Sequence, residues 1–149
     1  MTPEQFDQFK ADEDGAIDQL RVFVGRALGD RLDRSLPSLE FLDRFVQNLV
    51  ADPEWMKSAL FRDVSDNVRT WLAVRVAYYL AACLRDVYDV ECDLSEDHDS
   101  PVIGTPVLSI EGVEISPLEI ASAYLDGAVV GGLQGLVKDL QNEIHTTTH

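Results

Sequence analysis

One long apolar helix in the middle of the chain constrains the fold more than any other feature. From about Asp66 to Asp86, hydrophobic residues recur at helical spacing and cover most of the circumference. They are Val68, Trp71, Leu72, Val76, Tyr79, Leu80, Cys83 and Leu84. A helix that is apolar nearly all round is stable in water only when other elements surround it. The pattern therefore predicts the central helix of a bundle, with Ser65 as its N-cap.

Shorter amphipathic segments precede this helix. Thr2-Pro3 has the composition of a helix start, and the run Asp12-Glu13-Asp14-Gly15 is expected to interrupt the helix that follows. A second helix carries an apolar stripe from Ile17 to Leu28, with Gly29 as its C-terminal cap. A third is expected to start at Pro37, and a short helical segment is expected over residues 53–61.

After the long helix the period of the pattern changes. Apolar and polar residues alternate over 90–95, and two further short apolar runs, 107–110 and 113–115, flank a Glu111-Gly112 turn. Ser116-Pro117 then starts a helix, and the last helix is expected over 132–144. The prediction is an α+β protein, predominantly helical: a helical bundle with a small antiparallel three-stranded meander before the last two helices. We expect residues 1–145 to form a single globular domain and 146–149 a frayed tail.

The order of these elements carries a resemblance. The run Tyr78-Tyr79-Leu80, the run Leu84 to Tyr88, the strand Pro106 to Ile110 and the Ser116-Pro117 helix start follow one another over about residues 68–127. This arrangement resembles small uncharacterised bacterial domains in which a helix, a short meander and a proline-started helix follow in this order. The resemblance implies the α+β arrangement and no catalytic residues.

The charge of the chain is distributed unevenly. Of a net charge of −15, most arises after Arg85, where thirteen acidic residues accompany one basic residue, Lys138. This acidity argues against binding of nucleic acid or of an anionic membrane surface. Strand alternation predicts a common outer face for the acidic residues of the meander. These partner-binding candidates are Glu91, Asp93, Glu111 and Glu114.

The leading interpretation is a non-enzymatic binding protein whose acidic C-terminal surface docks a basic protein, as inhibitors and immunity-type proteins do. The plainer alternative is that the acidic surface has no partner and reflects solubility, salt adaptation or genome composition. A third possibility is a structural subunit of a homo-oligomer such as a homodimer.

A different class of function centres on Arg75, the one charged residue within the apolar run 71–84. Its guanidinium must reach solvent, find a carboxylate or line a pocket. In the last case Arg75 and Trp71 would form the wall of a ligand pocket between the long helix and the meander, as in an enzyme or a small-ligand-binding protein.

No complete constellation for catalysis or metal binding is visible. Asp97 and His98 lack further ligands at suitable spacing, and His145 and His149 flank three threonines that favour helix poorly. The glycines between 127 and 135 match no phosphate-binding motif and predict a turn with close helix packing. Cys83 and Cys92 occupy inward-facing positions and are expected to be reduced core residues. We therefore expect no catalytic residue, metal or cofactor.

The sequence also bears on location. The first ten residues are acidic and lead into no apolar segment, and the run 71–84 is too short to span a bilayer. A cytoplasmic protein without membrane association is the expectation.

Overall fold

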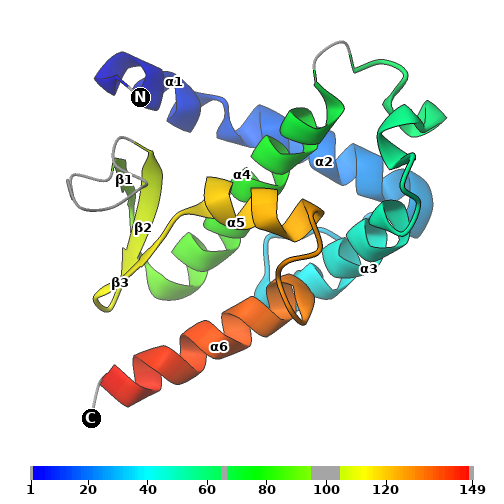
Figure 1. Ribbon diagram of the computed structural model, residues 1–149. Coiled ribbons are helices and arrows are strands. Elements are labelled where there is room, and N and C mark those ends of the chain that lie inside the picture. The colour runs from blue at the N-terminus through cyan, green and yellow to red at the C-terminus, as the bar shows by residue number, and fades with distance from the viewer. Residues whose placement is uncertain (1, 65–66, 95–104, 148–149) are drawn as a thin grey trace.

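The computed structural model describes residues 2–64, 67–94 and 105–147 (Figure 1). Helices make up most of these ranges, and a small sheet follows the fourth α-helix. The α-helices are α1 (Pro3–Ala11), α2 (Glu13–Leu28), α3 (Leu39–Val50), α4 (Val68–Tyr88), α5 (Pro117–Leu125) and α6 (Gly132–Thr147). The strands are β1 (Cys92–Leu94), β2 (Pro106–Ile110) and β3 (Val113–Ile115). The predicted α+β class is confirmed.

The long helix α4 is the centre of the fold. It lies between α2 and α5 and packs against both (Figure 1). Tyr79 and Leu80 are completely buried, as the apolar pattern predicted. Trp71 differs from that prediction, because it is only half-buried and lies at the edge of the core. The prediction of the cap was also wrong: Ser65 lies outside the described residues, and the N-cap is Asn67, whose side chain accepts the backbone N–H of Thr70.

The first two helices form as predicted, but the interruption expected over residues 12–15 is shorter, because α2 already begins at Glu13. Thr2 and Gln5 form a reciprocal capping box at the start of α1. Gly29 ends α2 with a φ of 79°, a conformation that glycine adopts without strain. The helix expected from Pro37 is split, because the 3₁₀ turn η1 (Leu36–Ser38) comes before α3. The segment expected over 53–61 forms two 3₁₀ turns, η2 (Trp55–Lys57) and η3 (Ala59–Phe61).

The three strands form the predicted antiparallel meander, in the order β1-β2-β3. Glu111 and Gly112 both have positive φ, 51° and 86°, as a two-residue type I′ turn requires. Cys92, Leu108 and Ile115 face each other across the ladder and are buried on the side that packs on α4 and α5. The sheet thus places one apolar face against the helices.

Helix α6 packs chiefly against α3, and a buried carboxylate joins the two. Asp43 of α3 is only 3% exposed, and it accepts hydrogen bonds from the backbone N–H groups of Leu133 (2.9 Å) and Gln134 (3.1 Å) at the start of α6. Asp43 also accepts hydrogen bonds from the Tyr124 hydroxyl at 2.6 Å and from the Gln134 side-chain amide at 3.1 Å. A residue of α3 therefore satisfies the first turn of α6.

Glycine makes this approach feasible. Gly132 has a φ of +68°, and a Cβ at this position would lie 2.7 Å from Cγ of Asp43. The prediction that these glycines serve a turn and close helix packing, rather than phosphate, is consistent with this geometry. The anion at the start of α6 is the protein's own carboxylate.

Candidate functional site

The four acidic residues predicted to bind a partner are all exposed, at different places on the meander. Glu91 lies just before β1 and Glu111 lies in the β2–β3 turn. Asp93 and Glu114 occupy the central positions of β1 and β3, on the sheet face opposite the buried Cys92, Leu108 and Ile115. Within the strands, this outer face therefore carries two of the four carboxylates.

The outer face is not purely polar. Val107 is the ladder partner of Asp93, so it lies on the same face, yet it is only 5% exposed. Ser109, the partner of Glu114, is exposed. The outer face of the sheet is thus buried at Val107 and exposed at Asp93, Ser109 and Glu114.

The bundle does little to neutralise the acidic residues that follow Arg85. Arg85 itself is paired with Glu13 of α2, and Asp126 is paired with Arg69 of α4 at 2.6 Å. Among the described residues, no ion pair joins a cation to the five exposed acidic residues between the end of α4 and the hairpin turn. These are Asp86, Asp89, Glu91, Asp93 and Glu111. Their negative charge faces solvent.

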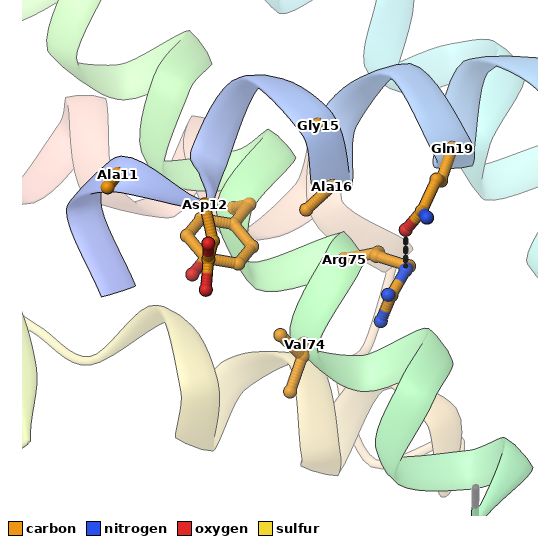
Figure 2. A pocket seen from close by; sticks show the side chains of 8 residues that line it. Ala11, Asp12, Gly15, Ala16, Gln19, Val74 and Arg75 are labelled. Atoms are coloured by element: carbon orange, nitrogen blue, oxygen red, sulfur yellow. Dashed lines mark hydrogen bonds between the residues drawn. The ribbon is translucent and has the colours of Figure 1, made fainter. Parts of the chain in front are cut away.

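Arg75 lines a groove of about 410 Å³ between α4 and the corner where α1 meets α2 (Figure 2). The lining side chains come from residues 11–19 and 74–78. They are Ala11, Asp12, Gly15, Ala16, Gln19, Val74, Arg75 and Tyr78. The predicted position of this pocket, beside the meander, is therefore wrong: the groove that contains Arg75 lies next to α2, because α4 turns this side toward the N-terminal helices.

The structure does bring Arg75 and Trp71 together. The Arg75 Cζ lies 4.0 Å from the centre of the Trp71 ring, within range of a cation–π interaction. Its Nε donates to Oε1 of Gln19 at 2.8 Å, and its Nη1 donates to the Trp71 carbonyl at 3.0 Å. The guanidinium thus bridges α2 and α4, which accounts for a charged residue in an apolar helix without invoking a ligand.

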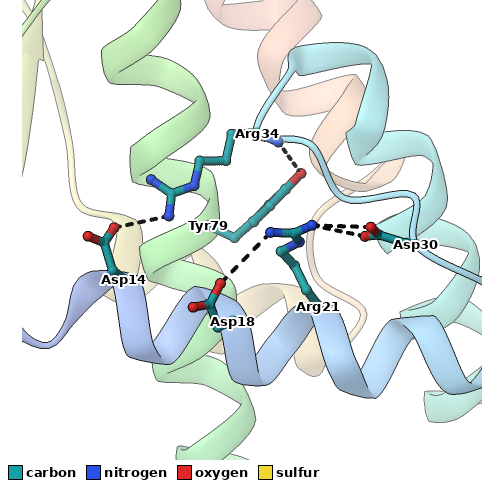
Figure 3. A network of polar contacts seen from close by, with 6 residues as sticks. All are labelled: Asp14, Asp18, Arg21, Asp30, Arg34 and Tyr79. Atoms are coloured by element: carbon teal, nitrogen blue, oxygen red, sulfur yellow. Dashed lines mark hydrogen bonds and ion pairs between the residues drawn. The ribbon is translucent and has the colours of Figure 1, made fainter.

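A second polar network fastens the loop after α2 (Figure 3). The Arg34 backbone N–H donates to the Tyr79 hydroxyl oxygen at 2.9 Å, and its side chain pairs with Asp14 at 3.0 Å. Arg21 pairs with Asp30 at 3.1 Å.

The buried Tyr79 hydroxyl also hydrogen-bonds Ser38, whose Oγ donates to the Ser35 carbonyl at 2.6 Å. Tyr79 thereby acts as a structural anchor for the loop.

Both thiols are buried and free. Burial raises the pKa of Cys83 to about 12 and that of Cys92 to about 11, so the nucleophilic thiolate is disfavoured in each. Within residues 2–64, 67–94 and 105–147, no group of three or more His, Cys, Asp or Glu side chains is placed to hold a metal ion. The candidate residues Asp97, His98 and His149 lie outside those ranges.

Sequence reasoning missed a third surface, an apolar groove of about 310 Å³ between β3, α5 and α6. Its walls include Val113 and Ile115 of β3, Ile120 of α5, and Leu136 and Leu140 of α6. Asp139 and Glu143 of α6 line it as well. The helical spacing of residues 136–143 was visible in the sequence, but the opposite wall depends on tertiary packing.

Comparison with known proteins adds no assignment to this geometry. No protein-family model, no curated protein and no solved structure matches the chain. In the part of the chain that the structure describes, no helix has both the length and the apolar character needed to cross a bilayer.

Proposed function

We propose that this protein is a non-enzymatic binding protein whose acidic C-terminal surface docks a basic protein partner. One observation carries the proposal: the meander and the adjoining end of α4 present exposed carboxylates that no cation among the described residues neutralises in an ion pair. They are Asp86, Asp89, Glu91, Asp93 and Glu111. Like charges on one part of the surface repel one another, and a partner of opposite charge relieves that repulsion.

The same charges favour rapid encounter. An acidic surface attracts a basic protein from a distance and orients it before contact, which raises the association rate constant. Inhibitors and immunity-type proteins benefit from such steering, because they must capture a partner before it acts. We therefore propose that the protein acts as an inhibitor or immunity-type protein, and that the exposed acidic residues of the meander contact its partner.

The first step of the test identifies the partner. The protein is cross-linked in its source cells and purified, and the attached proteins are identified by mass spectrometry. A basic protein that binds again when purified supports the proposal. A bound metabolite or metal would favour a small-ligand function, for which the grooves are the alternative sites.

The second step measures association kinetics by stopped flow across a series of salt concentrations. The variant Glu91→Gln, Asp93→Asn, Glu111→Gln should associate about tenfold more slowly at low salt, because steering depends on exposed charge screened over a Debye length of about 8–10 Å. The matched control, Glu4→Gln, Asp7→Asn, Asp63→Asn, removes three exposed carboxylates elsewhere. Equal rates for the meander variant and the wild type at every salt concentration would contradict the proposal.

A further inference from the structure

The groove between β3, α5 and α6 combines an apolar lining with an acidic edge. Besides the apolar residues of β3 and α5, its lining includes Leu136, Asp139, Leu140 and Glu143 of α6, and no Lys or Arg. These four residues are spaced i, i+3, i+4 and i+7, so they run along one side of α6 for about two turns, or roughly 10 Å. The wall formed by α6 is therefore a straight strip that contains both leucine and acidic side chains.

The mouth of the groove carries the most exposed large hydrophobic side chain in the described part of the chain. Val130, which also lines the groove, is 90% exposed. It stands in the short connection between α5 and α6, which Gly131 and Gly132 turn with φ of 78° and 68°. Because Val130 lies beside an apolar groove, its side chain extends the apolar surface that a bound partner would bury.

The shape of the groove favours a helix as its occupant. One wall is a helix face, and a second helix laid along it presents apolar side chains at matching i, i+3, i+4 and i+7 spacing. The other wall includes the edge strand β3, which is only three residues long. A strand of the partner added at this edge would form few backbone hydrogen bonds with β3, so a helix is the better occupant. The charge of the lining indicates the residues that flank the apolar stripe of the docked helix. Because Asp139 and Glu143 line the groove, these flanking residues should be Lys or Arg.

We propose that this groove receives a basic amphipathic helix of the partner, with its apolar stripe against Val130, Leu136 and Leu140 and its basic residues beside Asp139 and Glu143. The proposal rests on the proposed function, because it assigns the apolar anchor of the same basic partner. The exposed acidic residues of the meander speed association with the partner, and the apolar groove slows its dissociation. Apolar burial at the centre of an interface controls dissociation more than association.

The test uses a defined probe, a helical peptide of about five turns whose leucines form one stripe and whose other residues are lysines. A scrambled peptide of the same composition has the same charge without the stripe. Binding is measured by calorimetry, and the site is mapped by backbone amide chemical shifts. We expect the striped peptide to bind about tenfold more tightly than the scrambled one, with shifts at Val113, Ile120, Val130 and Leu136.

Two variants provide the matched comparison. Val130→Lys places a positive charge and a polar end at the mouth of the groove, and Val22→Lys makes the same change at another exposed valine, 57% exposed on α2. Both positions are open enough that the fold tolerates lysine. We expect Val130→Lys to weaken the striped peptide about tenfold and Val22→Lys to leave its affinity within about twofold of the wild type.

Other outcomes separate the two proposals. If both peptides bind equally and both are released by salt, the groove proposal is overturned while the acidic docking surface stands. If neither peptide binds at low salt, both proposals are overturned. If sedimentation shows a dimer that Val130→Lys dissociates and Val22→Lys does not, the groove holds a second copy of this chain, and the partner helix is excluded from it.

Discussion

The Asp43 carboxylate in α3 accepts the backbone N–H of Leu133 at 2.9 Å, across 90 positions of sequence, and so fixes where α6 begins. This carboxylate is buried and has four hydrogen-bond donors around it. Because α6 forms one wall of the apolar groove, the same contact positions the groove relative to β3 and α5. A single buried side chain thus links the helical core to the surface for which we propose a partner.

Loss of this carboxylate should destabilise the protein strongly. Asp43→Ala leaves two backbone N–H groups and the Tyr124 hydroxyl without an acceptor, so we expect a loss of about 3–5 kcal/mol in the free energy of unfolding. Chemical denaturation followed by circular dichroism measures this loss. The exposed Asp7→Asn serves as the control, with a change within about 0.5 kcal/mol. Equal stability of the two variants would show that Asp43 does not hold α6.

The glycine that admits Asp43 offers an independent test. In Gly132→Ala the new Cβ would lie 2.7 Å from Asp43 Cγ, on a backbone with a φ of +68°, so we expect a loss of about 2–4 kcal/mol. Gly15→Ala on α2 meets nothing within 4 Å and has no positive φ, so it should stabilise the protein by about 0.4–1 kcal/mol. Opposite signs for these two substitutions, measured in one denaturation series, are the expected result.

Local patterns predicted the elements well, and long-range contacts account for what they missed. The alternation around Cys92 and the Glu111-Gly112 turn were sufficient for the meander, because both signals depend on neighbours in sequence. Asp43 does have a sequence signal: it falls on the same helical stripe as Leu39, Leu42 and Val46 of α3. A carboxylate on a core-facing stripe indicates a buried partner, but nothing local indicates that the partner is the start of α6.

The sequence also did not predict which side of α4 packs against which neighbouring element. A helix that is apolar nearly all round gives no direction to its one charged residue, so Arg75 was expected beside the meander and lies instead against Gln19 of α2. The groove lined by Val113, Ile120 and Leu140 combines three elements, and its existence depends on how they pack.

The central position of α4 predicts a large effect for truncation of Leu80. This side chain is completely buried, so Leu80→Ala removes apolar contact and leaves a cavity, at a cost of about 2–5 kcal/mol. Val87→Ala, on the same helix but 50% exposed, should change stability by less than about 1 kcal/mol. A shift below about 0.5 kcal/mol for Leu80→Ala, measured by chemical denaturation, would place α4 at the surface of the molecule.

Burial of Tyr79 and Cys83 predicts the alkaline limit of stability. Burial raises the pKa of each in the folded protein to about 12, from ordinary values of 10.0 and 9.0. Above about pH 9 the unfolded chain therefore binds fewer protons than the folded protein, and stability falls as pH rises toward 12. Melting temperatures between pH 8 and 11 should show this decline, and Cys83→Ala should make it shallower. A decline as steep in Cys83→Ala as in the wild type would exclude the thiol as a contributor.

The contacts of the Arg75 guanidinium predict a structural role that stability measurements can test. Arg75→Met keeps the aliphatic stem and removes the guanidinium, which bridges Gln19 and the Trp71 carbonyl and lies 4.0 Å from the Trp71 ring centre. We expect a loss of about 1–2 kcal/mol in stability from the hydrogen bonds and the cation–π contact. Arg62→Met, at an exposed arginine, should change stability by less than about 0.5 kcal/mol. Because the proposed docking surface lies on the meander and α6, Arg75→Met should also leave partner association rates unchanged. A variant as stable as the wild type that no longer retains a co-purifying small molecule would assign Arg75 to a ligand site instead.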